Sequence, residues 1–144
     1  VGLMCLKVFV NGDQNLYNEL EDPARKLGAA FQKVNFLRDV KADYQDLGRT
    51  YFPGVDLDSF TASEKLEIER DIEKDLECAL EGIKRLPSSS RLGVFVAYRY
   101  YLSLFKKIKK IPTERLMKER IRVPNSKKLY ITFESAFQNQ FNWI

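Results

Sequence analysis

The sequence contains no histidine and only two cysteines among its 144 residues. These two shortages exclude zinc fingers, metal sites built from cysteine and histidine, and any mechanism that uses an imidazole base. Cys5 and Cys78 are a poor pair for a disulfide on sequence grounds. We therefore expect both thiols to be reduced and buried, in a reducing compartment.

Long hydrophobic runs are absent as well. Residues 1–10 and 92–105 are the most apolar, but Lys7 and Arg99 interrupt them, and a membrane-spanning helix needs about 20 apolar residues in succession. We therefore expect no membrane-spanning helix and a cytoplasmic protein. Peripheral contact of the protein with a membrane surface is an open alternative. With 44% hydrophobic residues, 10 Phe and 7 Tyr, the chain can form the core of one domain.

Charge is distributed unevenly along the chain. Residues 1–83 carry 10 basic and 17 acidic side chains, whereas residues 84–144 carry 14 basic and 3 acidic ones. Such asymmetry is compatible with an anionic partner. The basic cluster at residues 106–110 has a simpler explanation, because cations at the solvated end of a helix complement its dipole. The aromatic residues of the basic half are spaced for a core, so we expect no nucleic acid partner.

Hydrophobic periodicity predicts an all-α fold without strands. The second helix is expected to begin with Asp22 as its N-cap and Pro23 in its first turn. A capping box formed by Thr61 and Glu64 is expected to begin the third, and residues 88–90 a loop before the fourth. The expected helices cover residues 1–10, 22–47, 61–86, 91–111, 113–119 and 125–141, and Asn11-Gly12 is expected to end the first of them.

One predicted helix carries a polar stripe. Gln32, Asn35, Asp39 and Asp43 are spaced three, four and four residues apart, which places them on one face of the helix. Two carboxylates four residues apart repel each other, so a helix selected for stability alone would place a cation at one of these positions. An ordinary solvated face is one explanation. The other is a bound hard dication, because Mg²⁺ prefers oxygen ligands, usually binds one or two carboxylates and also coordinates substrate phosphates.

The same residues carry a family resemblance. Residues 32–43 follow the pattern Q-x-x-N-x-x-R-D-x-x-x-D, and residues 49–53 follow R-x-Y-x-P. Together they resemble the second aspartate-rich motif of the squalene/phytoene synthase family. Val1-Gly2 is similar to the end of that family's A-G-x-V-G helix. Further similarities lie at Tyr101, Leu104 and Ile108, at residues 120–123 and at residues 127–128.

The resemblance implies the C-terminal part of a type I isoprenoid-synthase helical bundle. It also implies head-to-head (1′-1) condensation of two prenyl diphosphates with Mg²⁺, with phytoene formed from geranylgeranyl diphosphate as the leading interpretation. Formation of squalene or dehydrosqualene from farnesyl diphosphate is the alternative, and NADPH is required only for squalene. A non-catalytic homologue that acts as a binding scaffold is a third interpretation.

The resemblance also assigns roles to individual residues. The implied metal ligands are Asn35, Asp39 and Asp43. The implied catalytic residues are Gln32, beside the reacting centre, and Tyr101, whose hydroxyl would face a diphosphate. The implied diphosphate-binding cations are Arg38, Arg120 and Lys128. Arg49 is expected either to hold a lid over the substrate or simply to anchor its loop.

Three features depart from the family pattern. Ala42 stands where the family often has Glu before the last Asp of the motif. Two extra residues between Tyr101 and Arg120 leave Tyr98 as the alternative for the tyrosine role. The first aspartate-rich motif, D-x-x-x-D, has no counterpart, because we expect Asp71 and Asp75 to lie on the charged outer face of their helix. We therefore expect residues 1–144 to be the C-terminal part of a synthase domain, inactive alone.

The aromatic residues of the predicted helices have two explanations. Phe95, Tyr98 and Phe105 could line a prenyl cavity and stabilise cations through their ring faces, or they could pack in an ordinary core. If half of the bundle is missing, Phe31, Phe95 and Phe105 would be exposed, and large exposed apolar patches usually bind a partner. The chain is therefore expected to self-associate or to pair with an N-terminal half.

Overall fold

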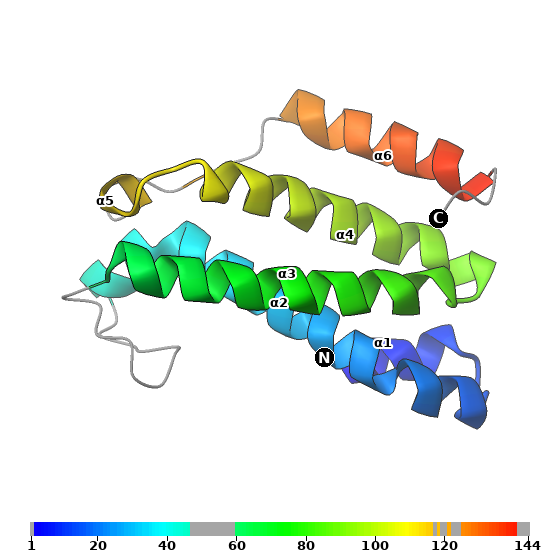
Figure 1. The fold of residues 1–144 in the computed structure, drawn as a ribbon. Coiled ribbons are helices and arrows are strands. Elements are labelled where there is room, and N and C mark those ends of the chain that lie inside the picture. Colours follow the sequence, from blue (N-terminus) through cyan, green and yellow to red (C-terminus); the bar gives the residue numbers. More distant parts are fainter. Residues whose placement is uncertain (1, 47–59, 117, 119–120, 122–124, 141–144) are drawn as a thin grey trace.

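The computed structural model describes residues 2–46, 60–116, 118, 121 and 125–140, and for residues 41–46, 125–128, 137, 139 and 140 it describes the backbone alone (Figure 1). Every regular element in these ranges is a helix, which confirms the all-α prediction. In chain order they are α1 (Gly2–Phe9), α2 (Gln14–Asp46), α3 (Ala62–Lys84), α4 (Ser88–Lys109), α5 (Thr113–Leu116) and α6 (Asn125–Gln140).

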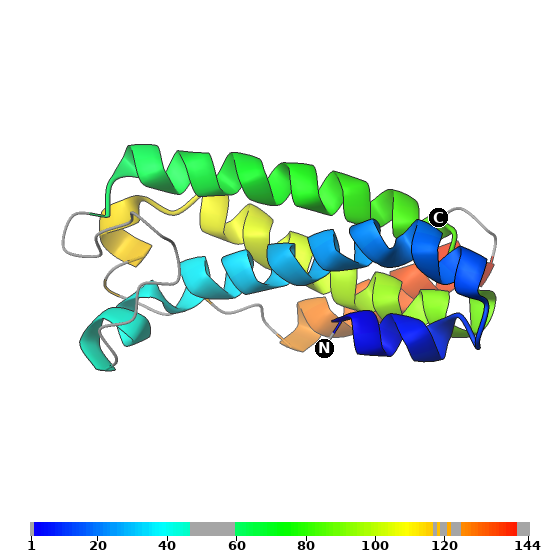
Figure 2. The same cartoon turned by 90° about the horizontal axis from the view of Figure 1, so that it is seen from below.

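The three longest helices, α2, α3 and α4, form the body of the molecule. α2 and α4 run in the same direction, and α3 lies alongside them in the opposite direction (Figures 1 and 2). α1 packs against the first half of α2, and α6 packs against α4. The main core lies between α2, α3 and α4, and a smaller apolar cluster of Leu6, Val10, Leu20 and Leu86 joins α1 to the rest.

The turn after α1 and the start of α3 follow the sequence prediction. Asn11 and Gly12 have φ angles of 47° and 85°, the left-handed conformation that ends a helix. The Thr61 hydroxyl accepts from the Glu64 backbone N–H at 3.2 Å, and the Glu64 carboxylate accepts from the Thr61 backbone N–H at 2.7 Å. This reciprocal pair is the expected capping box.

The predicted start of the second helix is wrong. α2 begins at Gln14, so Asp22 is not its N-cap and Pro23 lies inside the helix. The Asp13 carboxylate accepts from the Leu16 backbone N–H at 3.0 Å, as an N-cap residue does, and so begins the helix earlier. The Pro23 ring packs against α3 at Gly82, which has no side chain.

The fourth helix also begins earlier than expected. The Pro87 carbonyl accepts from the backbone N–H groups of Ser90 and Arg91 at 3.0 and 2.9 Å, so residues 88–90 form the first turn of α4. The proline itself needs no N–H partner, which suits it to this position. The loop expected at residues 88–90 is therefore wrong.

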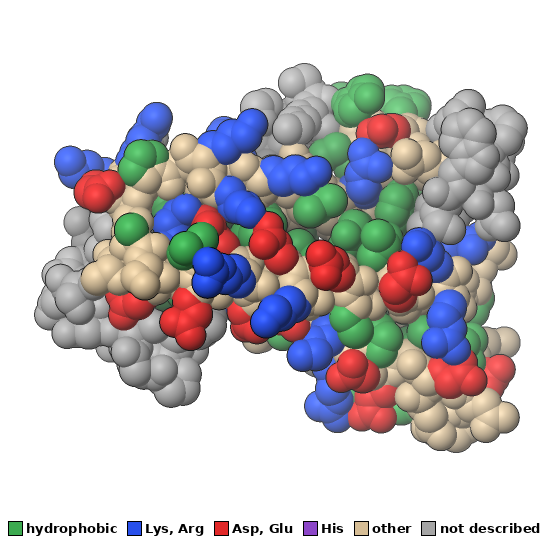
Figure 3. All heavy atoms as spheres, in the orientation of Figure 1, with side chains coloured by type: hydrophobic (Ala, Val, Ile, Leu, Met, Phe, Trp, Pro, Cys, Tyr) green, Lys and Arg blue, Asp and Glu red, His purple; other side chains and the backbone are tan. Residues whose placement is uncertain are grey.

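The interface between α2 and α3 contains charged residues that we expected on an outer face. Asp75 is only 2% exposed, and its carboxylate pairs with Lys33 at 2.6 Å and with Lys26 at 3.3 Å. Asp71 also pairs with Lys33. The outward position expected of Asp75 is wrong, because two lysines from α2 compensate the cost of burying its charge. Elsewhere α3 presents a mixture of acidic and basic side chains to solvent (Figure 3).

Two expectations about exposure are also wrong. Phe95 and Phe105 lie in the main core, and only Phe31 of the three phenylalanines is partly exposed. Cys5 is exposed, because Leu6 is the buried residue of α1, and Cys78 is half-buried. Both cysteines are free thiols. Within the described ranges, no helix has the length and apolar character needed to cross a membrane.

Gly82 is predicted to set the distance between α2 and α3. A Cβ atom at this position would lie 2.3 Å from the Pro23 Cβ, so the helices would have to separate. Gly82→Ala should lower the free energy of unfolding by about 1–3 kcal/mol. At Gly93, where a Cβ would meet nothing within 4 Å, Ala should raise it by about 0.5–1 kcal/mol. Urea unfolding of both variants is the measurement, and equal effects would contradict the prediction.

Candidate functional site

The predicted polar stripe lies on the second half of α2. Gln32 is exposed, Asn35 is half-buried, and the Asp39 side chain is 20% exposed. Asp43 lies on the same helix, but its side chain is outside the described residues. The stripe is therefore not a fully solvated face, because Asn35 and Asp39 are both partly covered.

Asn35 is held by a tyrosine from α4. Its Nδ2 atom donates a hydrogen bond to the Tyr101 hydroxyl oxygen at 3.2 Å. Its Oδ1 atom is buried and has no hydrogen-bond partner among the described residues. An unpartnered buried carbonyl oxygen is costly unless a ligand completes it, so this atom is the clearest sign of a binding function.

Aromatic contacts fix the position of Tyr101. Its ring stacks on Phe31 of α2 with 3.9 Å between the centroids and 15° between the planes. Tyr100 meets it edge-on at 5.5 Å. The alternative tyrosine, Tyr98, is buried and stacks on Phe95 at 6.2 Å, and this burial raises the pKa of its hydroxyl. Of these two tyrosines, only Tyr101 has its hydroxyl at Asn35.

Asp39 is paired with the neighbouring arginine. The Arg38 Nε atom donates to the two carboxylate oxygens of Asp39 at 3.1 and 3.0 Å, and Nη2 donates as well. The hydrogen bond to Asp39 raises the pKa of Arg38, although burial partly opposes this. Arg38 is expected to be one of the diphosphate-binding cations, and its guanidinium lies beside Asp39, a predicted metal ligand.

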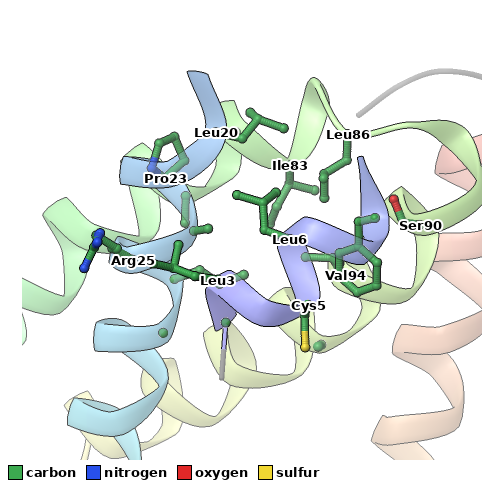
Figure 4. A pocket seen from close by; sticks show the side chains of 18 of the residues that line it. Leu3, Cys5, Leu6, Leu20, Pro23, Arg25, Ile83, Leu86, Ser90 and Val94 are labelled. Carbon is green, nitrogen blue, oxygen red and sulfur yellow. The ribbon is translucent and has the colours of Figure 1, made fainter. Parts of the chain in front are cut away.

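An apolar cavity lies between α1, α2, α3 and α4. It has a volume of about 1020 Å³, and leucine, isoleucine and valine side chains from all four helices and the segment after α3 point toward it (Figure 4). Phe31 and Gln32 line its end nearest to Asn35. Gly28 and Gly93 also line it, and a Cβ at either would meet nothing within 4 Å.

The oxygen atoms of the stripe suit a hard cation. No group of three or more acidic, cysteine or histidine side chains clusters within the described residues. The predicted metal ligands are a different set, however. Asn35 would bind through an amide oxygen, and the Asp43 side chain lies outside the described residues. The unpartnered Oδ1 of Asn35 and the carboxylate of Asp39, about one helical turn away, are the donor types that Mg²⁺ prefers.

The side chains of the remaining predicted site residues lie outside the described residues. Arg49 and Arg120 lie outside the described residues, and Lys128 lies on α6 with its side chain outside them. The basic cluster is placed, and Lys106, Lys107, Lys109 and Lys110 are exposed at the end of α4. Lys109 pairs with Glu73, which fits a solvated helix end rather than a binding site.

Sequence reasoning offered the wrong lining for the cavity and missed the contact between Phe31 and Tyr101. Phe95, Tyr98 and Phe105 lie in the main core and do not line the cavity. A cavity between four helices depends on how they pack, and no spacing along one helix encodes it. The sequence did contain one signal for the cavity. A glycine inside a helix lowers the stability of the helix and therefore indicates a steric or functional need. Gly28 and Gly93 are such positions.

Comparisons with known proteins identify the family of the chain. The sequence pattern of the squalene/phytoene synthase family matches residues 1–127. A bifunctional lycopene cyclase/phytoene synthase from Blakeslea trispora is 28% identical over 131 residues, a match that covers 78% of this chain and 22% of that protein. The chain therefore spans about a fifth of the length of this relative. No solved structure gives a significant match.

The family match includes all of α1 to α5 and the whole polar stripe of α2. The chain belongs to the squalene/phytoene synthase family.

Proposed function

We propose that this chain forms part of an enzyme that condenses two prenyl diphosphates head to head, and that α2 supplies its second metal-binding helix. The observation that carries the proposal is a polar site next to an apolar cavity. No group among the described residues forms a hydrogen bond with the buried Oδ1 atom of Asn35, and Phe31, which stacks on the Tyr101 ring, lines the cavity. A prenyl diphosphate combines the two matching parts, a charged head and a long apolar chain.

The polar site is proposed to bind Mg²⁺ through Asn35, Asp39 and Asp43. When bound, the ion would neutralise the charge that develops on a departing diphosphate. Arg38 would then exchange part of its contact with Asp39 for diphosphate oxygens, a role that suits a fixed planar cation. Arg120 and Lys128 are proposed as further diphosphate contacts, and Gln32 as the residue at the junction of the head site and the cavity.

The cavity is proposed to hold the prenyl chain. Its lining is predominantly apolar, as in most small-molecule sites, and Gln32 is a polar group at its end nearest to Asn35. The lining along α2 extends from Leu20 to Gln32, a distance of about 18 Å at the helical rise per residue. A site of this length suits a chain of several isoprene units.

The product is proposed to be phytoene, formed from geranylgeranyl diphosphate. Support comes from the relative whose name includes phytoene synthase. Squalene or dehydrosqualene formed from farnesyl diphosphate is the second candidate, and only squalene would require NADPH. Product analysis with both labelled diphosphates and Mg²⁺ distinguishes the two candidates. A non-catalytic scaffold would form no product, even when the N-terminal half of a family member is added.

The full reaction is proposed to need residues beyond this chain. One polar stripe cannot supply a second aspartate-rich face, so the chain alone should form no product. An N-terminal half of a family member should restore product formation when it is added. Light scattering is expected to show self-association of the isolated chain, because Met4, Val8, Leu129, Tyr130 and Phe133 are exposed apolar side chains.

Asp39→Asn is predicted to separate metal binding from stability. It should weaken Mg²⁺-dependent binding of inorganic diphosphate by more than about tenfold. Loss of an outer-shell partner already costs about that much, and loss of a direct ligand should cost more. The free energy of unfolding should change by at most about 1 kcal/mol, because the pair with Arg38 is partly solvated. Isothermal titration calorimetry and urea unfolding are the measurements.

The matched control is Asp22→Asn, which removes an exposed carboxylate from the first half of the same helix. This variant should bind Mg²⁺ and diphosphate as the unmodified chain does. If the two variants bind equally well, α2 has no specific metal site at Asp39.

Gly93→Phe is predicted to shorten the prenyl site. Gly93 lies two turns before Tyr101 on α4, about 12 Å along the helix axis, so a large side chain would fill the distal part of the cavity. Affinity for geranylgeranyl diphosphate should fall by about tenfold. Affinity for inorganic diphosphate should be unchanged, with farnesyl diphosphate between the two.

Lys106→Phe serves as the control, because Lys106 is exposed on the same helix and does not line the cavity. It should leave all three affinities unchanged. A uniform loss for all three ligands with Gly93→Phe would indicate damage to the fold and would contradict the proposed placement of the chain.

A further inference from the structure

The amide of Asn35 has two chemically different ends, and the structure gives them different surroundings. Its nitrogen end donates to the Tyr101 hydroxyl oxygen at 3.2 Å. Its oxygen end is buried and has no partner among the described residues. A rotation of the amide by 180° would exchange the two ends and place the nitrogen, which cannot bind a cation, where the oxygen now lies.

The position of Tyr101 does not depend on Asn35. Its ring is stacked on Phe31 and meets Tyr100 edge-on, so one aromatic ring from α2 and one from α4 hold it. These contacts involve the ring alone. The hydroxyl can therefore be removed with little change in packing, which makes its contribution measurable.

We propose that Tyr101 is a positioning residue that orients the Asn35 amide toward a divalent cation. This inference rests on the proposed metal site of α2. The hydroxyl oxygen accepts from Nδ2 and so favours the orientation in which Oδ1 is available as a ligand. A cation at Oδ1 withdraws electron density from the amide, which makes Nδ2–H a stronger donor and strengthens the hydrogen bond to Tyr101. The tyrosine therefore stabilises the metal-bound state more than the metal-free state.

Replacement of Asn35 by aspartate reverses this dependence. A carboxylate has oxygen at both ends, so it needs no orientation. The Tyr101 hydroxyl would then donate to a carboxylate oxygen and compete with the cation for it. Loss of the hydroxyl should weaken cation binding when residue 35 is asparagine, and should leave it unchanged or strengthen it when residue 35 is aspartate.

The test is a double-mutant cycle with Tyr101→Phe, Asn35→Asp and the double variant of the full 144-residue chain. Isothermal titration calorimetry gives the affinity for Mg²⁺ in the presence of saturating inorganic diphosphate. Tyr101→Phe should weaken Mg²⁺ binding by about tenfold in the asparagine background. It should not weaken binding in the aspartate background. Equal weakening in both backgrounds would overturn the proposal, because it would indicate a structural effect that does not act through the amide.

Tyr98→Phe is the matched control. It removes a hydroxyl from the same helix, one turn away. The described structure contains no hydrogen bond between Tyr98 and Asn35. Mg²⁺ affinity should be unchanged in this variant. A loss as large as that of Tyr101→Phe would also overturn the proposal.

A metal-free measurement separates this inference from the proposed function. In NMR spectra of the chain without Mg²⁺, the Asn35 side-chain amide protons should show nuclear Overhauser contacts to the Tyr101 ring, and Tyr101→Phe should alter their shifts. Absence of these contacts would overturn the orientation of Asn35 by Tyr101. If the contacts are present but no variant binds Mg²⁺, the metal site of the proposed function fails, and the positioning role fails with it.

Discussion

The close packing of α2 against its neighbours is the constraint on which the rest of the structure depends. Pro23 lies against Gly82 of α3, where a single Cβ atom would force the helices apart. Farther along the interface, Lys26 and Lys33 pair with the buried Asp75. These contacts fix one side of α2, so its opposite side faces α4 and the cavity in a defined register. One helix thereby contributes to the core, the cavity and the polar site.

The polar site and the core use α2 in different ways. Core residues such as Val34 and Leu37 are fully buried and gain stability from burial alone. Asn35 lies beside them, and its buried oxygen has no hydrogen-bond partner in the part of the chain that the structure describes, which costs stability. A site that gives up stability in this way is typical of residues retained for function.

The sequence was sufficient to predict the elements that local signals specify. The capping box of Thr61 and Glu64 and the turn at Gly12 depend on residues a few positions apart. Two local signals were nevertheless missed, because Asp13 and Pro87 begin α2 and α4 earlier than predicted. Prediction also failed where distant residues decide, because the Asp75 charge is buried by lysines of another helix. The polar stripe was found from its spacing. The cavity and the ring stack that holds Tyr101 depend on three-dimensional packing, and no spacing along the chain reveals them.

One titration tests most directly whether the stripe and the cavity form a single prenyl diphosphate site. Amide NMR spectra of the isotope-labelled chain are recorded with geranylgeranyl diphosphate, first with Mg²⁺ and then with paramagnetic Mn²⁺. We predict that Mn²⁺ broadens signals around Asn35 and Asp39, while the prenyl chain shifts signals of cavity residues such as Gly28 and Gly93. Broadening centred on the lysines at the end of α4, with no shifts along the cavity, would contradict the existence of this site.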